Sequence, residues 1–159
     1  MRLCIVRHGT AEIGADEDPL RQLTDKGLRE AQGAGRWLAE MLADGNLSAG
    51  ATIYASPYLR ARQTAEAIAF ATSLPLKEYE EIVPHGRLER LVEQLATEQT
   101  DIVLVSHLPL VGRLAAQLVD GQIYDQPWSP AECWVLEGDI AASGCMSVAS
   151  LWYPALDKH

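Results

Sequence analysis

The chain has 159 residues, of which 48% are hydrophobic, and it carries a formal net charge of −9 with a pI of about 4.8. This length and composition are typical of one globular domain with its own core, and they exclude a disordered chain. The acidic balance argues against nucleic acid and anionic membranes as partners, because both are bound through basic surfaces.

Apolar runs and helical patterns alternate along the chain, with a polar loop over residues 10–23 after the first run. We expect strands over residues 3–6, 51–55, 77–82, 101–106, 134–140 and 147–153. We expect helices over residues 25–42, 56–72, 86–98 and 109–119. The alternation predicts a mostly parallel sheet covered by helices on both sides, a three-layer α/β/α sandwich that forms one domain over residues 1–159.

The ends of the first two predicted helices carry capping signals. Thr24 is predicted to cap the first helix, whose apolar stripe consists of Leu28, Ala31, Gly35, Leu38 and Leu42. Ser56 and Pro57 are predicted to begin the second helix as its cap and its first residue. The strand over residues 101–106 is the most apolar, so we expect it to be central and buried on both faces.

The cysteine content and the amino-terminal residues of the chain indicate the cellular compartment. Cys4, Cys133 and Cys145 form no CxxC pair, so neither a disulfide framework nor a zinc site is implied, and we expect a reducing, cytoplasmic setting. The first apolar run is interrupted at Arg7, too early for a signal peptide. No apolar run approaches the roughly 20 residues of a membrane span.

Two strongly apolar strands each end in a histidine. His8 follows the first strand and His107 follows the strand over residues 101–106. In parallel α/β sheets, ligands bind beyond the carboxyl ends of the strands, so neighbouring strands here would bring both imidazoles to one crevice. A single histidine at a strand end is more often structural, but two of them beside arginines favour a binding or catalytic site.

Arginines accompany both histidines. Arg7 lies beside His8, and Arg60 belongs to the first turn of the second predicted helix, from which it can reach the same edge. Arg62 is about 200° further around that helix and is expected to face away. Guanidinium groups bind phosphate oxygens in bidentate fashion, so Arg7, His8, Arg60 and His107 predict a pocket for a tetrahedral dianion.

Four stretches carry a resemblance to a known family: LCIVRHGTAE, PLRQLTDKGLREAQ, IYASPYLRARQTAEAI and IVLVSHLPLV. In order, spacing and context they resemble the histidine phosphatase superfamily over about residues 1–120. The short chain and the SHLPLV string look most like its small phosphohistidine phosphatases of the SixA type. The resemblance implies a phosphoglycerate mutase-like α/β/α sandwich and an enzyme that needs neither metal nor cofactor.

The resemblance also implies a role for each matching residue. His8 would be the nucleophile that becomes phosphorylated, Arg7 and Arg60 would hold the phosphoryl oxygens, and His107 would hydrogen-bond the phosphoryl group. Larger members carry a carboxylic acid after the third strand as proton donor. In that region the chain offers Glu80, Glu81 and His85, of which Glu81 is nearest in register, although strand-edge glutamates are usually only solvated. Arg21, in the motif before the first helix, is interpreted as a solvated loop arginine, with an approach to the pocket as the alternative, and residues 125–134 are interpreted as a loop near the rim of the pocket.

Leaving-group chemistry narrows the expected substrate. An alkoxide needs a strong general acid to depart, whereas phosphohistidine releases a neutral imidazole whose conjugate acid has a pKa of about 6.5. The chain also lacks long insertions that would cover a small substrate. We therefore expect a phosphohistidine-carrying protein as partner, with phosphate ion as the product in the site. A small-metabolite phosphatase and a non-catalytic phosphoprotein-binding module are the alternatives.

Overall fold

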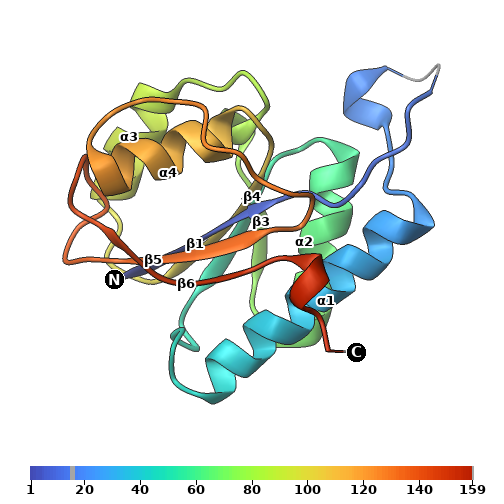
Figure 1. Cartoon of the computed structure of the whole chain (residues 1–159), viewed down its shortest axis with the longest axis horizontal. Helices are drawn as coiled ribbons and strands as arrows, with labels where there is room; N and C mark the ends of the chain where they lie inside the picture. Colours follow the sequence, from blue (N-terminus) through green and yellow to red (C-terminus); the bar gives the residue numbers. More distant parts are fainter. Residues whose placement is uncertain (15–16, 159) are drawn as a thin grey trace.

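The computed structural model describes residues 1–14 and 17–158. Over these residues a six-stranded sheet forms, with the order β3-β2-β4-β1-β5-β6 (Figure 1). Its strands are β1 (Arg2–Arg7), β2 (Thr52–Ala55), β3 (Leu76–Glu78), β4 (Ile102–Ser106), β5 (Cys133–Glu137) and β6 (Ser147–Trp152). The helices are α1 (Asp25–Ala43), α2 (Leu59–Thr72), α3 (Leu88–Ala96) and α4 (Leu110–Asp120), with 3₁₀ turns η1 (Asp18–Leu20), η2 (Glu80–Ile82) and η3 (Pro154–Leu156).

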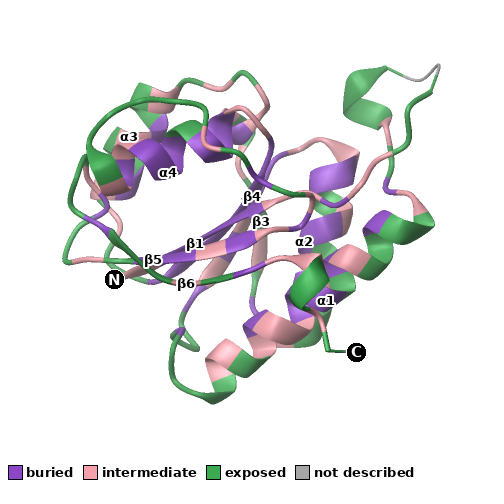
Figure 2. Ribbon diagram, in the orientation of Figure 1, coloured by how far each residue is buried: buried purple, intermediate pink, exposed green. Residues whose placement is uncertain are grey.

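The helices cover both faces of the sheet, which confirms the three-layer prediction. Helices α1 and α2 pack together on one face, and α3 and α4 lie on the other (Figure 1). Successive side chains of β1 point to opposite faces of the sheet. Cys4 and Val6 pack in the core under α1 and α2, whereas Leu3 and Ile5 pack in the core under α3 and α4. Figure 2 shows the central strands buried between the layers. This alternation is the side-chain period of a strand enclosed on both faces.

The sheet is parallel in one half and antiparallel in the other. Strands β3, β2, β4 and β1 are parallel, while β5 runs antiparallel to β1 and β6 antiparallel to β5. Parallel neighbours need a crossover, which the helices between β1 and β4 supply. The chain reaches β5 from the end of α4 through a long loop and needs only a short connection to enter β6. Strand β4, third in the sheet order, is buried at every position, as its apolar sequence predicts.

Four local predictions have different outcomes. Thr24 does cap α1, because its Oγ1 accepts a hydrogen bond of 2.9 Å from the Gly27 amide. The predicted start of the second helix at Ser56 is wrong: α2 begins at Leu59, and Ser56 lies in the turn before it, where its Oγ accepts from the Tyr58 amide at 3.2 Å. Leu28, expected in the apolar stripe of α1, is 43% exposed and does not belong to either buried core cluster. The predicted strand over residues 77–82 ends at Glu78 and continues as η2.

Candidate functional site: a cationic cavity at the ends of β1 and β4

The carboxyl ends of β1 and β4 meet at one cavity of about 310 Å³. The two strands are parallel neighbours in which Arg7 pairs with Ser106, and the His8 amide donates to the Ser106 carbonyl at 3.0 Å. The imidazoles that follow therefore lie together, with ring centroids 5.0 Å apart. The cavity is lined by Arg7, His8, Gly9, Thr10, Ala11, Arg21, Arg60, His107, Leu108 and Pro130. The structure thus brings together Arg7, His8, Arg60 and His107.

A close backbone approach fixes the turn that carries His8. Gly9 packs against Gly27 in the first turn of α1, so that a Cβ at Gly9 would lie 2.5 Å from the Gly27 carbonyl oxygen. The Gly9 amide donates to Thr64 Oγ1 on α2 at 3.1 Å. Glycine is thus required after His8 because a larger residue would push the turn away from both helices.

The His8 ring has a defined orientation and protonation. Its Nδ1 lies 2.6 Å from the Gly9 carbonyl oxygen, which can only accept, so Nδ1 carries the hydrogen. Its Nε2 lies 3.3 Å from Nε of Arg60. Burial lowers the pKa of His8 from 6.5 to about 4. The hydrogen bond to Gly9 raises this pKa, while the charges of Arg60 and Arg7 lower it further. The ring is therefore neutral near pH 7, with its lone pair on Nε2.

This lowered pKa predicts a pH-dependent stability. Below pH 6.5 the unfolded chain takes up a proton on His8 that the folded protein does not bind until about pH 4, so stability falls as the pH is lowered through that window. For His8 alone the loss between pH 7 and pH 5 is about 2 kcal/mol. In urea unfolding at these two pH values, His8→Gln should lose about 2 kcal/mol less than the wild type. His85→Gln, at an exposed loop position, should retain the wild-type difference; an equal difference in His8→Gln and wild type would contradict the assignment.

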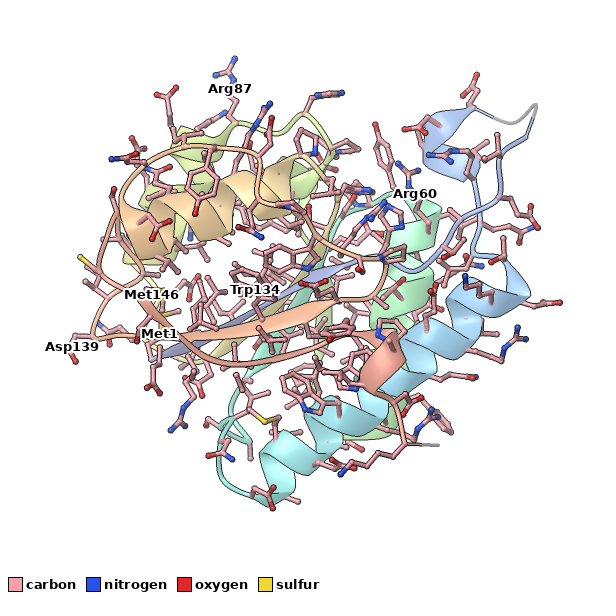
Figure 3. The ribbon with its side chains drawn as sticks, viewed as in Figure 1. Met1, Arg60, Arg87, Trp134, Asp139 and Met146 are labelled. Atoms are coloured by element: carbon pink, nitrogen blue, oxygen red, sulfur yellow. The ribbon has the colours of Figure 1, made fainter. Side chains whose placement is uncertain are left out.

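Arg60 reaches the cavity from the first turn of α2, as Figure 3 shows for the labelled side chain. The residue is 3% exposed, and its guanidinium lies 5.0 Å from the centroid of the Tyr58 ring. Arg62 faces away and pairs with Glu78 at 3.1 Å and Glu66 at 3.8 Å. The helical spacing therefore distinguished the two arginines correctly.

Arg7 is held by a segment far along the chain. Its Nη1 donates to the Trp128 carbonyl at 2.7 Å, and the Ala131 amide donates to the His8 carbonyl at 3.2 Å. Pro130 of the same segment lines the cavity, so residues 125–134 do lie at the rim. The Trp128 ring stacks on Trp134 of β5 with centroids 4.5 Å apart, which anchors this loop to the sheet.

His107 is almost fully buried, at 1% exposure. Its Nε2 lies 2.7 Å from Ser56 Oγ, and the Tyr58 ring contacts it edge-on with centroids 5.0 Å apart. Burial lowers the pKa of His107 to about 2, and repulsion from His8, Arg60, Arg21 and Arg7 would act on any charge that it gained. The second imidazole is therefore also neutral. Sequence reasoning did not detect the contact with Ser56, because it had assigned Ser56 to a helix cap.

Arg21 and Asp18 are additions to the predicted site. Arg21 is not a solvated loop arginine: it lines the cavity, and its Nη2 and Nε lie 2.8 and 2.9 Å from Asp18 Oδ1. Asp18 also accepts from Arg60, whose Nη2 lies 3.2 Å from Oδ2. Partial burial raises the pKa of Asp18, but its hydrogen bonds to Arg21 and Arg60 outweigh this and leave the pKa lowered. The carboxylate is therefore ionised and joins the two cations at the mouth of the cavity.

Glu81 is the one predicted site residue that the structure does not bring to the cavity. It lies in η2, where its Oε1 is 3.4 Å from Nη1 of Arg90. Among the described residues, those that line the cavity include no carboxylate. The site therefore combines three guanidinium groups with two neutral imidazoles, an arrangement that can bind a tetrahedral oxyanion and present a nitrogen lone pair to it.

Two further features of the described residues concern metals and membranes. Over residues 1–14 and 17–158, no group of three or more His, Cys, Asp or Glu side chains is arranged to hold a metal ion. None of the helices in this part of the chain combines the length and the apolar character that crossing a bilayer requires. Cys4, Cys133 and Cys145 are all free thiols.

Comparison with known proteins identifies the family to which this fold and this cationic cavity belong. Residues 3–83 match the family model of the histidine phosphatase superfamily (branch 1), and the chain belongs to this family. Its curated relatives include the phosphohistidine phosphatase SixA of Escherichia coli, 35% identical over 77% of this chain and 76% of the relative. A SixA homologue from Haemophilus influenzae is 34% identical over 74% of this chain and 77% of the relative. Among solved structures, the protein histidine phosphatase SixA complexed with tungstate superposes with a TM-score of 0.79 at 27% identity, covering 98% of both chains.

Proposed function

We propose that this protein is a phosphohistidine protein phosphatase that works through a phosphorylated His8. The observation that carries the proposal is the His8 ring: its hydrogen is on Nδ1, bound to the Gly9 carbonyl, and its Nε2 lone pair lies in a cavity lined by arginines. The names of the relatives in Escherichia coli and Haemophilus influenzae support this substrate class. The tungstate in the related structure is a tetrahedral oxyanion of the kind that this cavity suits.

The first step is transfer of the phosphoryl group to His8. Nε2 of His8 attacks phosphorus in line and the P–N bond of the substrate breaks, with its electron pair leaving on the substrate imidazole. Arg7 and Arg60 stabilise the charge on the equatorial oxygens, and His107 donates a hydrogen bond to one of them. In the second step water attacks the phosphorus of phospho-His8, which regenerates the neutral imidazole and releases phosphate.

The described residues that line the cavity carry no carboxylic acid, which supports P–N cleavage. Asp18 approaches Arg60, but its lowered pKa keeps it ionised and unsuited to protonate a leaving group. Glu81 pairs with Arg90 outside the cavity. A substrate imidazole protonated on its other nitrogen departs as a neutral molecule and needs no acid, whereas a serine alkoxide does.

The test offers purified protein a phosphohistidine-carrying protein and a panel of phosphate monoesters, including a phosphoserine peptide, with EDTA throughout. We expect phosphate release from phosphohistidine to exceed release from every monoester by about 100-fold or more in kcat/KM, since only the esters need the missing acid. Equal turnover of the phosphoserine peptide, or preference for a small ester, would overturn the substrate assignment. Binding without any release would favour the phosphoprotein-binding module instead.

A further inference from the structure

Ser56 is buried completely between β2 and α2 and does not line the cavity, yet it contacts a residue that does. Its Oγ has two polar neighbours among the described residues: the Tyr58 amide at 3.2 Å and Nε2 of His107 at 2.7 Å. A serine hydroxyl has one hydrogen to donate and two lone pairs to accept with.

The directions of these two hydrogen bonds follow from the chemistry of the partners. The Tyr58 amide can only donate, so it occupies a lone pair of Oγ and leaves the hydroxyl hydrogen free. Over residues 1–14 and 17–158, the one acceptor that this hydroxyl contacts is Nε2 of His107. Were Nε2 to carry the hydrogen instead, the Ser56 hydroxyl hydrogen and the Nδ1 lone pair would both be buried without a partner among the described residues, whereas donation from Ser56 leaves only the Nδ1 hydrogen unpaired. Ser56 therefore donates and His107 Nε2 accepts.

This direction determines the other nitrogen of the ring. Burial among cations keeps His107 neutral, so with Nε2 accepting, its single N–H is on Nδ1. Nδ1 is buried and has no hydrogen-bond partner among the residues described. The Tyr58 ring, 5.0 Å away, and the His8 ring, also 5.0 Å away, hold the imidazole between them at the cavity. A phosphoryl oxygen on His8 would give this unpaired donor its acceptor.

We propose that Ser56 is a positioning residue that selects the Nδ1–H form of His107 and thereby aims a hydrogen-bond donor at the transferring phosphoryl group. The inference rests on the proposed function and deepens it. Without the hydroxyl, the His107 hydrogen can move to Nε2, and Nδ1 then presents a lone pair to a negatively charged oxygen. Because this hydrogen bond helps to hold the phosphoryl oxygens in the in-line geometry of the transition state, the loss falls mainly on kcat rather than on KM.

The experiment measures the tautomer of His107 directly. Protein labelled with ¹⁵N-histidine is examined by imidazole NMR at pH 7, for the wild type, Ser56→Ala and Ser56→Thr. We expect His107 to be the Nδ1–H form in the wild type and to gain the Nε2–H form in Ser56→Ala, while His8 stays Nδ1–H in both. On the phosphohistidine protein, kcat should fall about 10- to 100-fold in Ser56→Ala with KM changed less than threefold, and Ser56→Thr should restore part of kcat.

Ser106→Ala is the matched control. Ser106 is also a fully buried serine at a strand end, but its hydroxyl donates to the Ile82 carbonyl at 2.6 Å and does not contact the imidazoles. We expect this variant to lose stability in urea unfolding while the His107 tautomer and kcat stay within threefold of the wild type. A wild-type His107 in the Nε2–H form, or an unchanged kcat in folded Ser56→Ala, would overturn the inference. Failure of the wild type to hydrolyse phosphohistidine would instead overturn the proposed function, because the tautomer is read without substrate.

Discussion

His8→Ala should abolish phosphate release and leave no phosphoenzyme when the protein is mixed with a ³²P-labelled phosphohistidine substrate and quenched rapidly. The expected result follows from the ring geometry, because no other described side chain in the cavity presents a nitrogen lone pair with its second nitrogen anchored by a backbone carbonyl. Nucleophilic catalysis splits the reaction at the phosphoenzyme, so removing the nucleophile removes both steps.

His85→Ala provides the control for His8→Ala, since His85 is an exposed loop histidine away from the cavity. It should keep wild-type turnover and labelling. An acid-labile phosphoenzyme in His8→Ala, carried for example by His107, would show that the nucleophile had been misassigned. Far-UV circular dichroism should be unchanged in both variants, because neither side chain belongs to the main hydrophobic core.

Arg60→Ala should lower kcat/KM by about 10²-fold or more, the scale of loss when one donor to a developing oxyanion is removed. The residue is 3% exposed, and its guanidinium lies within hydrogen-bonding reach of His8 Nε2, the atom to which phosphorus becomes bonded. At such burial its charge is less screened by water than a surface charge. Arg60→Lys should recover only part of the rate, because an ammonium cannot hold two oxygens in a planar fork.

Arg62→Ala is matched to this variant in residue type and helix. Its guanidinium pairs with Glu66 and Glu78 on the outer face, so we expect kcat/KM within threefold of the wild type. Steady-state kinetics on the phosphohistidine protein compare the two. A near-normal rate in Arg60→Ala, or equal losses in both variants, would contradict the assignment of Arg60 to the phosphoryl group.

The features that the sequence predicted correctly depend on the periodicity of side chains in helices and strands and on the order of these elements along the chain. His8 and His107 were predicted to lie together because each follows a strongly apolar strand, and parallel strands end at the same edge of a sheet. Arg60 was separated from Arg62 by a helical rotation of about 100° per residue, which holds whatever the helix packs against. The antiparallel pairing of β5 and β6 was not specified, because a strand pattern carries no direction.

The features that sequence missed depend on where loops lie in space. Ser56-Pro57 satisfies the local rule for a helix start, but the buried turn before α2 uses the Ser56 hydroxyl for His107 instead. Arg21 and Asp18 come to the cavity because η1 lies against the start of α2, a contact between segments about 40 residues apart. No local pattern predicts that the Trp128 carbonyl binds Arg7.

The hydrogen bond from Arg7 to the Trp128 carbonyl also bears on when activity can arise during protein synthesis. It joins residues 121 positions apart, and the loop that provides the carbonyl is anchored to β5 through the two stacked tryptophans. A nascent chain that ends before β5 contains His8, Arg60, His107 and the Trp128 carbonyl, yet it lacks Trp134, which anchors the loop that orients Arg7. Domains of this size fold as cooperative units. We therefore expect incomplete chains on the ribosome to leave cellular phosphohistidine untouched, with phosphatase activity appearing only once the carboxyl-terminal strands have emerged.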